Sequence, residues 1–157
     1  MQGTCPPLWR AMTAGTRRIS PSMRNAAEAV RWATAQITHP TQDWQRKCES
    51  FTRQSLGLNA YAASAKIAAG DVPVQHRNLL ATPKDWQGIP AGAQILVPDM
   101  GTFGHAYLSI GSGQAISTDY KRRGQVDVCA ADLPNWHVSK YHPFWTLWTP
   151  AGMTPVK

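Results

Sequence analysis

Small and hydrophobic residues recur at helical spacing over the first half of the chain. From Asn25 onward they predict a helix, which Ser22 or Asn25 could cap. This helix should end before His39-Pro40, because the residue before a proline is steered out of the helical region. Further along, a helix of small residues is expected over about Tyr61 to Ala69, where Gly70-Asp71 stops it.

Another helix is predicted between these two. Thr41 and Asp43 favour its start, and Gly57 lies where a C-terminal glycine cap belongs. Positions i, i+4, i+7 and i+11 of this segment form one face, and they are Trp44, Cys48, Phe51 and Ser55. Cys48 should therefore lie in the first two turns of a helix, on the face that packs.

The second half of the chain shows short segments of alternating pattern, separated by turn residues, as expected for β-strands. A short turn of helix is expected before them, after Thr82-Pro83 and around Trp86. The predicted strands are Ala93 to Pro98, His105 to Ile110, Gln114 to Asp119, Gln125 to Cys129 and a last one near Phe144 to Trp148. Helices first and strands afterwards predict an α+β domain, with helices packed on one face of an antiparallel sheet of about five strands.

Two of these strands form a β-hairpin that carries a histidine. Its predicted loop is Gly111-Ser112-Gly113, a common three-residue connection. Such a loop pairs Ile110 with Gln114, Tyr107 with Ser117, and His105 with Asp119. Directly opposed residues have Cβ atoms about 4.5–5.5 Å apart, so a carboxylate would lie beside the imidazole. This arrangement orients a histidine that acts as a general base.

Composition limits the class of protein and suggests a partner. The chain has 157 residues, with 16 Lys and Arg against 9 Asp and Glu, a net charge of +7. We expect a basic arm over residues 1–24, one domain over 25–150 and a tail over 151–157. The positive charge favours an anionic partner such as an acidic cell-wall polymer, a membrane surface or nucleic acid. No run approaches the roughly 18 apolar residues of a membrane span, and no apolar core of a secretory signal is found near the N-terminus.

Cys48 and His105 are the residues with the clearest chemistry. A thiol becomes nucleophilic as a thiolate, and a helix N-terminus or a nearby cation lowers its pKa. Arg46 and Lys47 add positive charge beside Cys48. The ordinary alternative is a packed, inert cysteine on an apolar helix face. The three cysteines show no CxxC spacing, so neither a metal site nor a cofactor is expected.

The order of these segments resembles the NlpC/P60 superfamily of cysteine peptidases, which is related to the CHAP group. A helix cysteine comes first, then the strand Ile89 to Val97, then Gly104-His105-Ala106-Tyr107-Leu108-Ser109-Ile110-Gly111. The resemblance implies a papain-like fold in which Cys48 is the nucleophile and His105 the base. A polar residue on the following strand would orient His105, and Asp119 is preferred, with Ser117 in reserve. The family commonly has Asp-Cys-Ser-Gly at the nucleophile, whereas here the segment 47–50 reads Lys-Cys-Glu-Ser.

The resemblance implies a peptidoglycan hydrolase, either a cysteine endopeptidase or an amidase, that cleaves stem peptides through a thioacyl intermediate. Trp44, Tyr107 and Arg122 are the expected substrate-binding residues. Arg122 is included because it belongs to the basic run Lys-Arg-Arg at 121–123, which follows Asp119 closely. Such a protein would act as a monomer at the bacterial cell wall, as a phage lysin, a virion-associated enzyme or a protein exported by a non-classical route. Two alternatives stay open: a non-catalytic module that binds cell wall or nucleic acid, and a thiol acyltransferase on the same fold.

Overall fold

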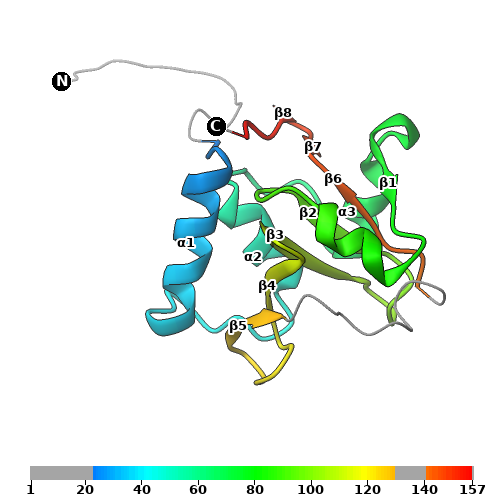
Figure 1. Cartoon of the computed structure of the whole chain (residues 1–157). Helices are drawn as coiled ribbons and strands as arrows, with labels where there is room; N and C mark the ends of the chain where they lie inside the picture. The colour runs from blue at the N-terminus through cyan, green and yellow to red at the C-terminus, as the bar shows by residue number, and fades with distance from the viewer. Residues whose placement is uncertain (1–22, 130–140, 157) are drawn as a thin grey trace, which may run out of the picture.

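The computed structural model of the chain describes residues 23–129 and 141–156. This part is a mixed α+β structure, as predicted, in which three α-helices come before all of the described strands (Figure 1). The helices are α1 (Ala26–Thr38), α2 (Cys48–Ser55), α3 (Ala65–Asp71) and the 3-10 helices η2 (Val74–His76) and η3 (Pro83–Gly88). The strands are β1 (Asn78–Leu79), β2 (Gln94–Val97), β3 (His105–Gly111), β4 (Gln114–Thr118), β5 (Val126–Cys129), β6 (Phe144–Thr146), β7 (Trp148–Thr149) and β8 (Gly152–Met153).

The main sheet has six antiparallel strands in the order β1-β6-β2-β3-β4-β5, and β7 and β8 pair separately. The strands β2 to β5 follow one another as the predicted meander. The chain then returns to place β6 on the outer side of β2. The pattern did not predict β1, because this edge strand is only two residues long and both residues are exposed.

The first helix begins as expected, while the second begins later than predicted. Asn25 caps α1 in a capping box with Glu28, whose carboxylate accepts the Asn25 N–H at 3.0 Å. The expected start of α2 near Thr41 is wrong, since the helix begins at Cys48. The preceding segment is bent because Arg46 adopts a left-handed backbone conformation with φ 59°. Cys48 therefore stands at the N-terminus of its helix.

The limits of the third helix also differ from prediction. Ser64 caps α3, and its Oγ accepts the N–H of Ile67 at 3.2 Å. The helix therefore begins after Tyr61 and runs through Gly70 to Asp71 rather than stopping before them. A cap residue that accepts a backbone N–H fixes where a helix begins more strongly than the propensity of the residues before it.

The sheet is buried on both faces. Its helix-facing side carries Leu96, Ala106, Leu108, Ile116 and Val126, which pack against α1, α2 and α3. The other side carries Ile95, Tyr107, Ala115 and Cys129, which pack with Trp86 of η3. The α-helices do lie on one face, as predicted, and Cys129 is buried on the other face. Both faces are covered because η3 and several aromatic side chains close the second one.

The β3–β4 hairpin has a tighter turn than predicted. Gly111 pairs with Gln114, so Ile110 does not, and the loop is Ser112-Gly113. Both loop residues have positive φ (55° and 73°), as a type I′ turn requires. An irregularity between Ser109 and Gly111 absorbs the extra residue, and the pair Leu108 and Ile116 keeps the predicted register. The predicted pair of His105 and Asp119 does not form in the ladder, because β4 ends at Thr118.

Residues near both ends of the described part form hydrogen bonds with the helices. The Arg24 guanidinium donates to the carbonyl of Gln54 at 2.7 Å and lies over the ring of Trp32. Ala26 N–H donates to the carbonyl of Pro155 at 2.8 Å, so residues beyond 150 contribute contacts to α1. The rest of the predicted basic arm lies outside the described residues. Among the helices described, none has the length and apolar character needed to span a membrane.

We predict that Gly92→Ala destabilises the domain by about 2–3 kcal/mol, because overpacking and a strained backbone add. Gly92 has φ +88°, and an added Cβ would lie 2.6 Å from the Cβ of Ala26. The matched control is Gly70→Ala in α3, where an added Cβ meets nothing within 4 Å. Alanine should raise stability there by up to about 1 kcal/mol. Urea unfolding measures both changes, and equal effects at the two glycines would contradict the packing of α1 on this loop.

Candidate active site

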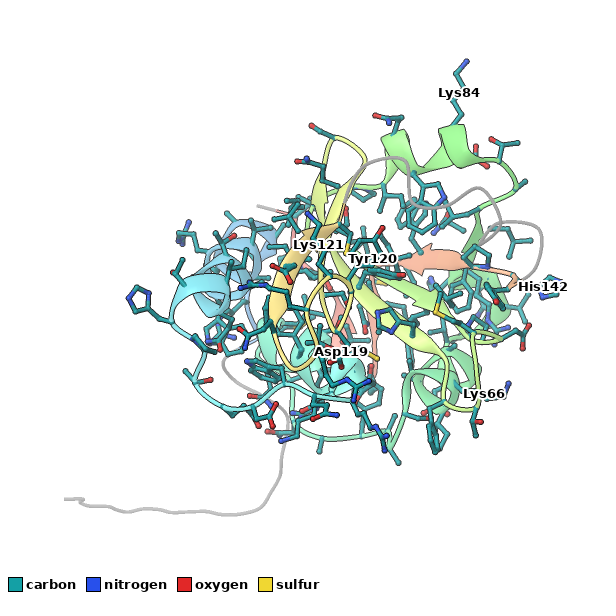
Figure 2. The ribbon with its side chains drawn as sticks, turned by 90° about the horizontal axis from the view of Figure 1, so that it is seen from below. Lys66, Lys84, Asp119, Tyr120, Lys121 and His142 are labelled. Carbon is teal, nitrogen blue, oxygen red and sulfur yellow. The ribbon has the colours of Figure 1, made fainter. Side chains whose placement is uncertain are left out.

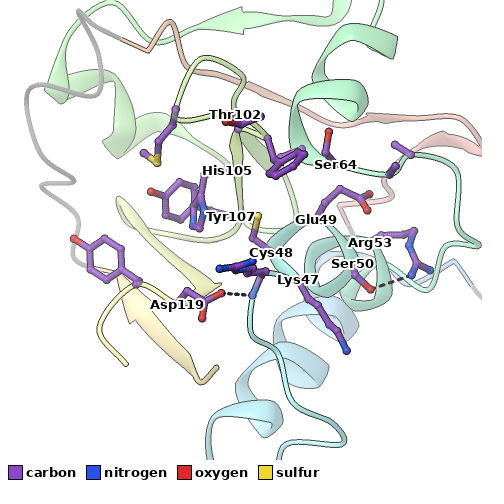
Figure 3. Close-up of a pocket in the computed structure, with 18 of the residues that line it drawn as sticks. Lys47, Cys48, Glu49, Ser50, Arg53, Ser64, Thr102, His105, Tyr107 and Asp119 are labelled. Carbon is purple, nitrogen blue, oxygen red and sulfur yellow. Dashed lines mark hydrogen bonds between the residues drawn. The ribbon is translucent and has the colours of Figure 1, made fainter. Parts of the chain in front are cut away.

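A cavity of about 1170 Å³ opens at the N-terminus of α2. Its wall comes from the start of α2, the loop before α3, the loop before β3 and the turn after β4. Cys48, His105, Tyr107 and Asp119 all line it, and Figure 3 shows the Cys48 sulfur between His105 on one side and Glu49 on the other. The structure therefore brings the predicted nucleophile and the predicted base into one pocket.

The segment before Cys48 is held by side chains from elsewhere. The Asp119 carboxylate accepts the N–H of Arg46 at 2.6 Å and the N–H of Gly124 at 2.6 Å. Buried Gln36 of α1 accepts the indole N–H of Trp44 at 3.1 Å. These bonds tie the approach to α2 to the β4–β5 turn and to α1, so they determine where Cys48 lies.

Cys48 is half-buried, and its surroundings act on the thiol in opposite directions. Burial raises the pKa of Cys48 to about 11, and the negative charges of Glu49 and Asp119 add to the rise. Backbone hydrogen bonds from Ala106 and Glu49 act the other way and stabilise the thiolate. The expectation that Arg46, Lys47 and the helix N-terminus lower the pKa is therefore wrong, because burial outweighs them. At neutral pH the resting group is a thiol.

His105 begins β3 and is supported by aromatic rings. Its imidazole lies edge-on to the ring of Tyr107, with ring centroids 4.7 Å apart. The Tyr107 ring in turn lies edge-on to the ring of Trp86, with centroids 6.4 Å apart. The preceding Gly104 has φ +70°, and an added Cβ would lie 3.0 Å from the backbone of Lys66 and of Val97. A glycine is required there because α3 and β2 approach the chain so closely.

The Ser117 hydroxyl is hydrogen-bonded to the His105 imidazole. A bond of this kind was expected from the residue that orients the histidine. The Ser117 Oγ lies 3.0 Å from Nε2 of His105, and it donates to the carbonyl of Ala106 at 2.6 Å. A hydroxyl has one proton, so Ser117 accepts from Nε2, which must then carry the hydrogen. We assign this tautomer from the hydrogen-bond network. It leaves the lone pair on Nδ1.

Asp119, the preferred third residue, has a different set of partners. It directly follows β4 and has φ 58°, and Figure 2 shows it near the centre of the view from below, close to Tyr120 and Lys121. Its carboxylate binds the backbone N–H groups of Arg46 and Gly124, as described above. The structure thus gives Ser117 the bond to Nε2 and places Asp119 where it holds the loop before Cys48.

Of the three predicted substrate-binding residues, Tyr107 lines the pocket and the other two do not. Trp44 is 0% exposed and packs edge-on against Phe51 with ring centroids 5.3 Å apart, so it belongs to the core. Arg122 lies outside the residues that line the cavity and donates to Asp127 at 2.7 Å. Tyr107 does line the cavity, but it is only 1% exposed and its ring supports His105. The amphipathic helix expected around Trp44 was misleading because that segment is not helical.

Glu49 is a residue of the pocket that sequence reasoning missed. It is 7% exposed, and burial raises its pKa to about 7, while the charge of Arg53 lowers it. The signal was its position directly after the candidate nucleophile. Within residues 23–129 and 141–156, no group of three or more His, Cys, Asp or Glu side chains could hold a metal ion.

We predict that iodoacetamide alkylates Cys48 slowly at pH 6 and faster by roughly tenfold per pH unit toward pH 11, because only the thiolate reacts. The raised pKa of about 11 sets this range. Glu49→Gln should shift the rise to lower pH, since it removes a negative charge beside the sulfur. Peptide mapping by mass spectrometry separates Cys48 from the other two cysteines, Cys5 and Cys129. A rate that is already maximal between pH 6 and 8 would contradict the burial of the thiol.

Comparison with protein-family models and with curated proteins finds no match to this chain. Three features of the pocket bear on its chemistry. They are a cysteine at a helix N-terminus without a side-chain cap, a histidine on the same cavity, and a buried serine hydrogen-bonded to the imidazole. A thiol, an imidazole and a hydroxyl placed in this way are the kinds of group that acyl-transfer chemistry uses.

Proposed function

We propose that this protein is a cysteine peptidase or amidase with a papain-like fold of the NlpC/P60 type, and that it cleaves peptide or amide bonds in peptidoglycan stem peptides. The observation that carries the proposal is the shared cavity of Cys48 and His105, with Ser117 bonded to Nε2. The sequence resemblance around Cys48 and His105 supports the choice of substrate. Arg46, Lys47 and Arg53 also line the cavity, which suits an anionic polymer.

The proposed reaction begins with a neutral thiol. Nδ1 of His105 takes the proton while the Cys48 sulfur attacks the carbonyl carbon, and the carbonyl π electrons move to oxygen. The tetrahedral intermediate collapses to a thioester as the C–N bond breaks, and the imidazolium protonates the leaving amine. Water then attacks the thioester with His105 as the base, which releases the acid and restores the thiol.

Backbone N–H groups at the start of α2 would stabilise the oxyanion. Lys47 provides no side-chain cap to this helix, so its first N–H groups are available to a ligand. Backbone hydrogen bonds from Glu49 and Ala106 also act on the Cys48 thiol and stabilise its thiolate form. Such donors stabilise the charge that develops on oxygen in the transition state.

The test is digestion of purified peptidoglycan, followed by mass spectrometry of the released fragments. Wild type should release peptide fragments, while Cys48→Ala and His105→Ala should lower the rate by at least about a thousandfold, since the residues act as one unit. Cys129→Ala is the matched control, because this second thiol lies in the core and outside the residues that line the cavity. Equal fragments from wild type and Cys48→Ala would refute the proposal and favour a binding module.

We predict different effects for the two candidate orienting residues. Ser117→Ala should lower kcat about ten- to hundredfold, because a hydrogen bond to a charged imidazolium contributes about 1.5–3 kcal/mol. Asp119→Asn should chiefly lower the melting temperature, since the amide nitrogen cannot accept a backbone N–H. Steady-state kinetics and thermal unfolding separate the effects. A larger loss of kcat in Asp119→Asn at unchanged stability would assign the orienting role to Asp119.

A further inference from the structure

A buried carboxylate lies beside the nucleophile without a partner on one of its oxygens. Glu49 follows Cys48 in the first turn of α2, lines the same cavity and is 7% exposed. Its Oε2 is enclosed and has no hydrogen-bond partner among the described residues. An unsatisfied carboxylate oxygen in such a place costs free energy. A ligand that supplies a donor would recover that cost.

The Arg53 guanidinium, on the same helix, forms its hydrogen bonds with groups other than Glu49. Arg53, one helical turn away, donates to the carbonyl of Leu58 at 2.8 Å and to the hydroxyl of Ser50 at 3.2 Å. Arg53 therefore acts on Glu49 through its charge alone. In Figure 3 the Glu49 side chain lies on the opposite side of the Cys48 sulfur from His105.

We propose that the Glu49 carboxylate is the anionic wall of a subsite that binds a primary ammonium group of the substrate, next to the bond that Cys48 attacks. An ammonium group fits because it offers three donors and the charge that a buried carboxylate needs. This inference rests on the proposed peptidase function and names a feature of its substrate. A peptide can supply the ammonium from its free N-terminus or from the side chain of a diamino acid.

The raised pKa of Glu49, about 7, agrees with this role. In the free protein the carboxylate is costly to ionise because of burial. A bound cation would stabilise the ionised form and so lower this pKa. The first turn of a helix favours a negative side chain as well, so the position is suited to a carboxylate that is charged when the ligand is bound.

The experiment uses peptides that contain both amines and differ only in acetylation: neither amine blocked, the N-terminal amine blocked, or the side-chain amine blocked. Wild type should lose about ten- to hundredfold in kcat/KM when the amine that binds Glu49 is acetylated, and the two singly blocked peptides identify which amine it is. Glu49→Gln should reduce this discrimination to less than about threefold. Because Glu49 also affects the pKa of Cys48, the ratio between peptides is compared rather than the absolute rate.

Asp99→Asn is the matched control. Asp99 is a half-exposed carboxylate outside the residues that line the cavity, bonded to His142 and to Lys66. Its substitution removes the same charge from the protein and should leave the discrimination at the wild-type value. Discrimination that persists in Glu49→Gln would overturn the inference, as would equal rates for all peptides with the wild type.

Binding measurements distinguish a failure of this inference from a failure of the proposed function. If wild type cleaves none of the peptides, calorimetric titration with the same set still tests the subsite. The unblocked peptide should then bind at least about tenfold more tightly than the blocked one, and Glu49→Gln should remove the difference. Equal binding by both, or no binding by either, overturns the ammonium subsite.

Discussion

The register of the β3–β4 hairpin is the constraint on which the site depends. A strand has a side-chain period of two, so a slip of one residue would turn Ser117 to the other face of the sheet. The type I′ turn at Ser112-Gly113 and the irregularity before Gly111 together fix the register. They bring the Ser117 hydroxyl to Nε2 of His105 and, on the opposite face, Ile116 beside Leu108 in the helix-facing core. Packing and chemistry thus depend on the same pairing.

The same hairpin also positions the nucleophile. Beyond β4 the chain turns at Asp119. The Asp119 carboxylate accepts a hydrogen bond from the N–H of Arg46, two residues before Cys48. Arg46 adopts a left-handed backbone conformation, which costs energy for a residue with a side chain. The short bond to Asp119 offsets that cost, so the approach to α2 depends on the end of β4. Cys48, His105 and Ser117 are in this way positioned by one hairpin and its following turn.

Sequence patterns predicted the features that repeat and missed those that depend on single contacts. The alternation in β3 and the spacing in α1 are periodic, so these elements were found with nearly correct limits. The start of α2 depends on the bond between Arg46 and Asp119, which are 73 positions apart, and no local pattern carries it. Ser117 and Asp119 share a face in an ideal strand. Only the end of β4 at Thr118 separates their roles, and sequence alone favoured the stronger acceptor.

The resting thiol and the buried carboxylate can be understood together. Cys48 has a raised pKa partly because Glu49 carries negative charge nearby, and Glu49 has a raised pKa because it is buried. A cation bound at Glu49 would cancel the charge that opposes the thiolate, while the N–H groups of Ala106 and Glu49 continue to stabilise it. The two proposals taken together therefore couple substrate binding to activation of the thiol. The nucleophile would be protonated and unreactive in the free protein, and its proton would pass to Nδ1 of His105 more readily once the pocket is filled.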